Sequence, residues 1–176
     1  MSKFVIDNLH SEIEFKVKHL MISTVTGRFT DFTAEIISEK EDFTDAQISF
    51  EADVNSITTS VVDRDNHLKS PDFFDAESYP KLTFKSTSVS LENNSYNVTG
   101  LLNMHGVEKE VTLVGEYNGN DTDLYGNKKH GFELTGTIQR SEFGLTFNAT
   151  TDKGGILVSD DVKLIASVQF IEVVMA

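Results

Sequence analysis

The sequence predicts an all-β protein: a single antiparallel eight-stranded barrel with one short helical insertion. The first observation is a period of two, as in Ser11–Lys18, where Ile13, Phe15 and Val17 alternate with polar residues. Such alternation is typical of a strand with one buried and one solvated face. The second observation is that most connections between such tracts are short, which favours antiparallel pairing. The third is that only one segment, Ser56–Ser70, breaks the period of two.

The same alternation recurs along the rest of the chain. The tracts are Thr24–Phe29, Phe32–Ile36, Ala46–Val54, Lys81–Ser86, Tyr96–Met104, Val111–Tyr117, Phe132–Arg140 and Val162–Phe170. The inward phase changes from odd to even numbers between Phe29 and Phe32, which predicts a bulge or bend at Thr30-Asp31. A sandwich of two sheets has the same local pattern and is the alternative architecture.

The helical insertion is expected within Ser56–Ser70. Its apolar residues Ile57, Val61, Val62 and Leu68 fit a helical spacing better than a strand, and Pro71 ends it. No linker, low-complexity tract or repeat divides the chain, so residues 1–176 are expected to form a single domain.

Composition excludes several functions. The 176 residues include 28 acidic and 15 basic ones, giving a formal charge of −13, and no Cys. The acidic balance disfavours binding to nucleic acid or to an anionic membrane surface. The lack of Cys excludes disulfides, thiolate catalysis and Cys-ligated metals.

The N-terminal residues do not resemble a signal peptide. The apolar run Phe4–Ile6 ends at Asp7, well short of the 7–15 apolar residues that a signal peptide needs. Later apolar runs are too short for a helical membrane span. A cytoplasmic location with no integral membrane segment is therefore expected.

Small residues recur on the predicted inward faces. They are Gly27, Ala34, Ala52, Ser86, Gly100, Gly115, Gly136 and Ala166. An eight-stranded barrel is just wide enough to be filled by side chains or to hold one small ligand. Small inward residues favour an apolar cavity, whereas the alternative is that they permit strand coiling and tight packing.

The predicted ligand-binding residues lie on these inward faces. They are Phe15, Val17, Phe29, Phe32, Ile48, Phe50, Phe84, Val98, Gly100, Leu102, Leu113, Phe132, Leu134, Gly136, Ile138, Arg140 and Phe170. Arg140 continues the inward phase at a strand end, where a cation suits a phosphate or a quinone oxygen. The alternative is an ion pair of Arg140 with Glu142 or Asp161.

Catalytic and metal-binding motifs are not found, so no catalytic residue, metal ligand or cofactor is predicted. Asp63 and His67 are four residues apart on one helical face, but a zinc helix needs two His at that separation beside a Glu. No Gly-x-Ser-x-Gly motif occurs. An enzyme using Asp63, Asp65 or His67 on a small hydrophobic substrate is the least favoured hypothesis.

Ordered motifs along nearly the whole chain resemble a known family. They are Asp7–Ser11 with Ile13 and Phe15, Val17–His19, Thr26–Phe29, Arg64-Asp65, His67–Ser70, Asp72–Asp75, Tyr79-Pro80, Gly106 with Lys109 and Val111, Gly131-Phe132, and Ile138 with Arg140 and Phe143-Gly144. The set resembles the YceI-like family of lipocalin-like polyisoprenoid-binding proteins. The resemblance implies an elongated barrel whose apolar tunnel holds a polyprenyl phosphate or an isoprenoid quinone, and it implies no catalytic motif.

The leading hypothesis is therefore non-enzymatic binding, storage or transport of a long-chain isoprenoid lipid. The main alternative is a packed barrel that acts as an interaction or stress protein without a lipid, in which case an edge strand pairs with a partner and a homodimer is possible.

Overall fold

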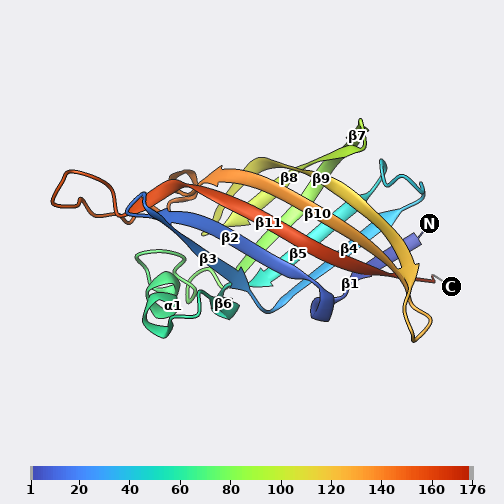
Figure 1. Ribbon diagram of the computed structural model, residues 1–176, viewed down its shortest axis with the longest axis horizontal. Coiled ribbons are helices and arrows are strands. Elements are labelled where there is room, and N and C mark those ends of the chain that lie inside the picture. The colour runs from blue at the N-terminus through green and yellow to red at the C-terminus, as the bar shows by residue number, and fades with distance from the viewer. Residues whose placement is uncertain (1, 175–176) are drawn as a thin grey trace.

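The computed structural model describes residues 2–174 and consists mainly of β-strands (Figure 1). The strands are β1 (Ser2–Ile6), β2 (Glu12–His19), β3 (Ser23–Phe29), β4 (Phe32–Ser38), β5 (Gln47–Asp53), β6 (Ile57–Thr58), β7 (Lys81–Glu92), β8 (Ser95–Met104), β9 (Val107–Thr122), β10 (Lys128–Gln139) and β11 (Val158–Val173). The helical elements are α1 (Val62–Lys69) and the 3-10 turns η1 (Asn8–His10), η2 (Val54–Ser56) and η3 (Arg140–Phe143).

The strands form a closed antiparallel barrel. Their order is β1-β4-β5-β7-β8-β9-β10-β11, and β11 pairs with β1 to close the ring. Strands β2, β3 and β6 extend the sheet from β11. The predicted eight-stranded barrel is confirmed, and closure excludes the sandwich alternative.

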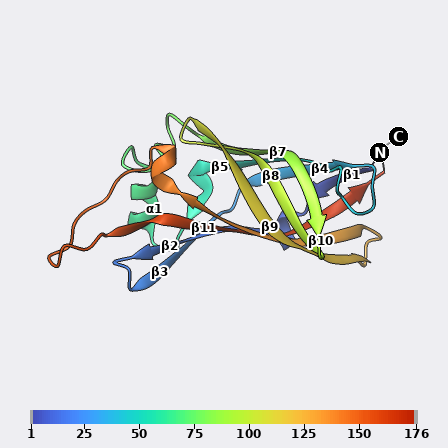
Figure 2. The same cartoon turned by 90° about the horizontal axis from the view of Figure 1, so that it is seen from above.

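The barrel is elongated, and its two ends differ. The start of β1 and the end of β11 lie at one end, on the right of Figure 1. Helix α1, β6 and the long connection from β10 to β11 lie at the opposite end (Figures 1 and 2).

Strand β1 closes the barrel but was not expected from the sequence. Its residues pair with β4 on one side and with β11 on the other, and Phe4 and Ile6 are buried. The apolar run Phe4–Ile6 is continuous, so the period of two is hidden. Strand β1 pairs with the last residues of β11 and β2 with its earlier residues, so β2 and β3 continue the barrel wall beyond the eight strands of the closed ring. The predicted change of inward phase is confirmed, because β3 ends at Phe29 and β4 begins at Phe32 with both side chains buried.

The helix is shorter than expected. It covers Val62–Lys69, whereas Ile57 and Thr58 form β6 against β3. Asp65 Oδ1 accepts hydrogen bonds from the backbone N–H (2.7 Å) and the hydroxyl (2.6 Å) of Thr59, which holds the residues before the helix extended. Ile57 is buried and pairs with Phe29 of β3, and this pairing outweighs its helical spacing to the later apolar residues.

Several inward glycines permit close packing and do not open space. A Cβ at Gly27 would overlap the Phe15 ring, one at Gly136 would lie 2.6 Å from Leu113 Cδ2, and one at Gly100 would lie 2.5 Å from Phe84 Cζ. A Cβ at Gly115 would overlap the backbone carbonyl oxygen of the neighbouring strand β10. At these four positions the packing interpretation of the small residues is therefore correct.

Gly115→Ala is expected to lower the free energy of unfolding by about 1–3 kcal/mol, because the added methyl overlaps the carbonyl of Glu133. The measurement is urea denaturation. The matched control is Gly131→Ala on β10, where the nearest atom to an added Cβ is 3.6 Å away. Equal losses in the two variants would contradict the packing role of Gly115.

An ion-pair cluster ties the residue after β1 to β10. Asp7 Oδ2 lies 2.6 Å from Lys129 Nζ and 2.9 Å from His10 Nδ1. Burial acts to raise the pKa of Asp7, but the hydrogen bonds from Lys129 and His10 outweigh it and hold the pKa below its ordinary value.

The ionised Asp7 carboxylate is accordingly expected to stabilise the folded protein fully at pH values above the ordinary carboxyl pKa of about 4. This stabilisation is expected to be lost as the pH falls through the lowered pKa that Asp7 has in the folded protein. At neutral pH, Asp7→Asn should cost about 1 kcal/mol, an intermediate value for a mostly buried charged pair. Urea denaturation of both proteins at stepped pH should show the difference shrinking as the pH falls below the ordinary carboxyl pKa of about 4. A difference that stays constant with pH would contradict this role.

Candidate functional site

The barrel encloses one extended cavity of about 200 Å³. One buried water needs about 10–15 Å³, so there is room for on the order of 15. The lining side chains are almost all aliphatic or aromatic and offer water few hydrogen-bond partners. Such a space suits an apolar guest better than a column of water.

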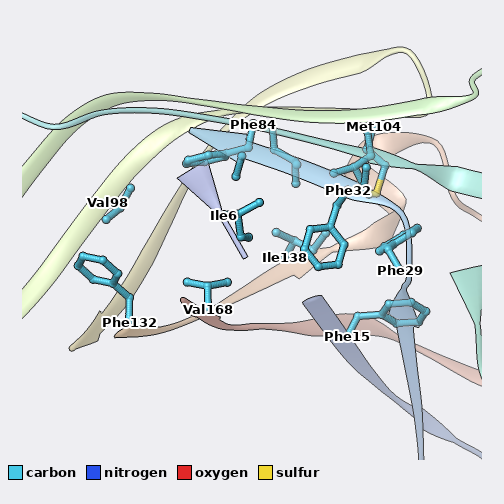
Figure 3. Close-up of a cluster of buried hydrophobic side chains, with 14 of the residues drawn as sticks. Ile6, Phe15, Phe29, Phe32, Phe84, Val98, Met104, Phe132, Ile138 and Val168 are labelled. Atoms are coloured by element: carbon cyan, nitrogen blue, oxygen red, sulfur yellow. The ribbon is translucent and has the colours of Figure 1, made fainter. Parts of the chain in front are cut away.

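Two facing walls form the cavity, because each strand directs alternate residues inward. One wall is built by β9, β10, β11 and β2, whose register places Leu134 opposite Ala166 and Leu164 opposite Phe15. The other wall is built by β4, β5, β7 and β8, with Ile48, Phe50 and Phe84 among its residues. Figure 3 shows buried side chains from both walls directed toward the interior.

Several inward side chains are only half-buried although they face the barrel interior. These residues include Ile48, Phe50, Leu113, Leu134 and Leu164. Their remaining exposed surface faces the cavity, so the interior is not filled by side chains. The barrel is therefore hollow along much of its length.

Most of the sequence-predicted ligand-binding residues line this cavity. They are Phe15, Phe29, Ile48, Phe50, Phe84, Val98, Leu102, Leu113, Phe132, Leu134, Ile138 and Phe170. The cavity does not reach Val17, Phe32, Gly100, Gly136 or Arg140. Val17 lies nearer the β2–β3 turn, Phe32 packs against Phe50 with ring centroids 6.2 Å apart, and the two glycines are covered by neighbouring side chains.

Other lining residues were not among the predicted ligand-binding residues. Ile6 belongs to the unexpected strand β1, and Phe43 and Phe74 lie between strands. Alternation cannot identify residues in loops. Ala34 and Ala166, singled out as small inward residues, do line the cavity.

Arg140 is buried away from the cavity. Its guanidinium donates to three backbone carbonyls, those of Ser159 (2.9 Å), Leu145 (2.6 Å) and Val158 (3.2 Å). Burial lowers its pKa, and the nearby Asp160 acts in the opposite direction. Within residues 2–174 it forms no ion pair with Glu142 or Asp161. Arg140 is therefore a structural residue that joins η3 to β11, which corrects the expected head-group contact and its alternative.

The polar residues of α1 lie on the outer surface and not in the cavity. His67 Nε2 lies 2.9 Å from Asp72 Oδ2, and its ring packs edge-on against Phe73 and Phe147. Burial acts to raise the pKa of Asp65, but its hydrogen bonds with Thr59 lower it. No group of three potential metal ligands occurs among the described residues.

A closed antiparallel barrel around an apolar cavity, with one short helix, is the architecture of a lipocalin-like protein. The chain belongs to the YceI-like family, whose domain matches residues 4–170. The UPF0312 protein SERP2314 of Staphylococcus epidermidis is 39% identical over 171 residues, which are 97% of this chain and 98% of that protein. None of the helices described for residues 2–174 is long and apolar enough to cross a membrane.

Solved structures share the fold. The Campylobacter jejuni YceI protein is 33% identical with a TM-score of 0.75, over 89% of this chain and 90% of that one. BcnA of Burkholderia cenocepacia is 24% identical with a TM-score of 0.81, over 93% of this chain and 98% of that one. A polyisoprenoid-binding domain from Saccharophagus degradans is 15% identical with a TM-score of 0.66, over 96% of this chain and 97% of that one.

Proposed function

We propose that this protein binds a long-chain isoprenoid lipid, such as a polyprenyl phosphate or an isoprenoid quinone, in the barrel cavity and stores or carries it unchanged. The observation that carries the proposal is the extended apolar cavity between the two walls of the barrel. The shared fold of the polyisoprenoid-binding domain supports the chemical class.

Burial of the chain supplies enough free energy for binding. Each buried methylene contributes about 0.8 kcal/mol, so about 20 of them give on the order of 16 kcal/mol. Lost translational and rotational freedom costs roughly 4–15 kcal/mol, which still leaves measurable affinity for a long chain. A charged anchor is not required.

The side chains around the cavity support a binding role and not catalysis. Glu14 is the one charged residue among the described lining residues. The Tyr96 hydroxyl donates to the backbone carbonyl of Asp42, and burial raises the pKa of this tyrosine further from neutrality. The lining therefore offers no pair of groups poised for acid–base chemistry at neutral pH.

The main alternative is an interaction protein with a packed interior. The hollow barrel supports a ligand over this alternative, because apolar side chains around an empty space forgo contacts that a guest would supply.

Uptake of neutral polyprenols of increasing length, measured by displacement of an environment-sensitive fluorophore, tests the proposal. Affinity should rise with each added isoprene unit until the cavity is full, because every unit buries more apolar surface. An affinity independent of chain length, or no uptake at any length, would contradict it.

A further inference from the structure

The barrel wall has a gap in its backbone pairing. The β1–β4 ladder ends at Val5 opposite Glu35, and the β2–β3 ladder ends at Ile13 opposite Phe29. Between them, η1 on one side faces the bend between β3 and β4 on the other. Among the described residues, one hydrogen bond crosses this gap, from Asn8 Nδ2 to the Phe32 carbonyl (2.6 Å).

An open surface pocket lies over the gap. Its lining is Asn8, Leu9, His10, Ser11, Glu12, Arg28, Phe29, Thr30, Phe32 and Ser167. Phe29 lines both this pocket and the interior cavity, and 7% of its surface is exposed. Figure 3 shows the Phe29 ring near Phe15 at one side of the buried cluster. Phe29 therefore lies between the polar surface pocket and the apolar interior.

A charged hydrogen-bond donor lies on the outer side of this partition. Arg28 is exposed, and within residues 2–174 its side chain forms no ion pair or hydrogen bond. Thr30 and Ser11 also line the pocket, but their hydroxyls donate to the backbone carbonyls of Ser56 (3.2 Å) and Gln169 (3.4 Å), so the guanidinium of Arg28 is the donor left for a ligand. Glu12 is the acidic residue of the pocket, and its negative charge opposes an anion there unless the anion pairs directly with Arg28. The pocket thus suits one hydrogen-bond-accepting group placed directly on Arg28.

We propose that this gap is a side portal, where the polar head of an amphipathic lipid rests on Arg28 while its tail passes Phe29 into the cavity. The inference rests on the proposed function and adds the entry route and the head-group contact. The head is a group that accepts hydrogen bonds, either a phosphate or a carbonyl oxygen. Opening the wall here breaks one side-chain hydrogen bond and no strand pairing, which makes it an easy place to separate.

The entry route is tested by rates. Association of geranylgeraniol with Phe29→Ala is expected to be about tenfold faster than with the wild-type protein, because the partition is removed. Asn8→Ala should be faster to a smaller extent, since the hydrogen bond across the gap is lost. The control is Phe73→Ala, a buried ring that lines neither pocket. If Phe29→Ala does not fold, Phe29→Leu replaces it. Rates equal to those of Phe73→Ala would overturn the portal.

The head-group contact is tested by equilibrium binding. Arg28→Gln should weaken binding of geranylgeranyl phosphate about tenfold and leave geranylgeraniol unchanged, which assigns the head as phosphate. Weaker binding of a prenylated quinone alone would assign a carbonyl head. Lys85→Gln on β7 removes the same charge from an exposed site far from the pocket and should change neither. Equal effects of the two substitutions on every probe would overturn the role of Arg28.

The two proposals fail in different ways. A wild-type protein that binds geranylgeraniol, with variants that match it in rate and affinity, would overturn the portal and leave the cavity function standing. A wild-type protein that takes up none of the probes would overturn both.

Discussion

Ala166→Phe is expected to abolish measurable uptake of a long polyprenyl chain. Ala166 lies on β11 between Leu134 and Ile13, in the wall of the cavity, and is only half-buried. A phenyl ring there would occupy the space of the chain. Excluding on the order of 10 methylenes would forfeit about 8 kcal/mol of burial, which is most of the roughly 1–12 kcal/mol left to a chain of about 20 after the costs of binding.

The control for this substitution is Thr135→Phe. Thr135 of β10 pairs with Ile165 of β11, and its side chain is exposed. The substitution therefore adds the same phenyl ring on the outer surface of the barrel and not in the cavity. Fluorophore displacement by long polyprenols should give no signal for Ala166→Phe and a wild-type affinity for Thr135→Phe. Unchanged uptake by a folded Ala166→Phe protein would show that the chain does not lie along this wall.

Arg140→Met is expected to lower the free energy of unfolding by about 3–5 kcal/mol. The guanidinium satisfies the carbonyls of Leu145, Val158 and Ser159 in a site where 6% of the arginine surface is exposed. A methionine of similar volume leaves these acceptors without their charged donor. A loss of this size is a large part of the stability of a typical domain.

Urea denaturation measures this loss, and Arg28→Met is its matched control. Arg28 is exposed and its side chain has no hydrogen bond or ion pair among the described residues, so its loss should cost under about 0.5 kcal/mol. If Arg140→Met were as stable as Arg28→Met, the assignment of Arg140 as a structural residue would be wrong.

Alternation predicted the barrel because each long strand buries one face. This is clearest in Ser95–Met104, where every second residue from Tyr96 onward is buried. The same rule located the bend at Thr30-Asp31, since a reversal of phase requires a break in the strand. It failed for β1, whose run of three apolar residues has no visible period. It also failed for β6, which is too short to show one.

The candidate site was predicted in its walls and not in its polar parts. Phe50 and Leu134 follow directly from the inward phase, whereas Phe74 reaches the cavity from a connection that has no period. The gap beside Phe29 depends on where two ladders end, and a single sequence does not show register between strands. Arg140 was expected to continue the inward phase of its strand, but β10 ends at Gln139 and Arg140 begins η3, where three backbone carbonyls determine its role.

Mass spectrometry of lipids extracted from the purified, detergent-free protein tests the central claim most directly. The account predicts an isoprenoid-type lipid recovered in near-stoichiometric amount from the wild-type protein and from Thr135→Phe, and none from Ala166→Phe. Contradiction would come from a wild-type barrel that yields no lipid and takes up no added polyprenyl compound, or from equal lipid recovery in all three proteins.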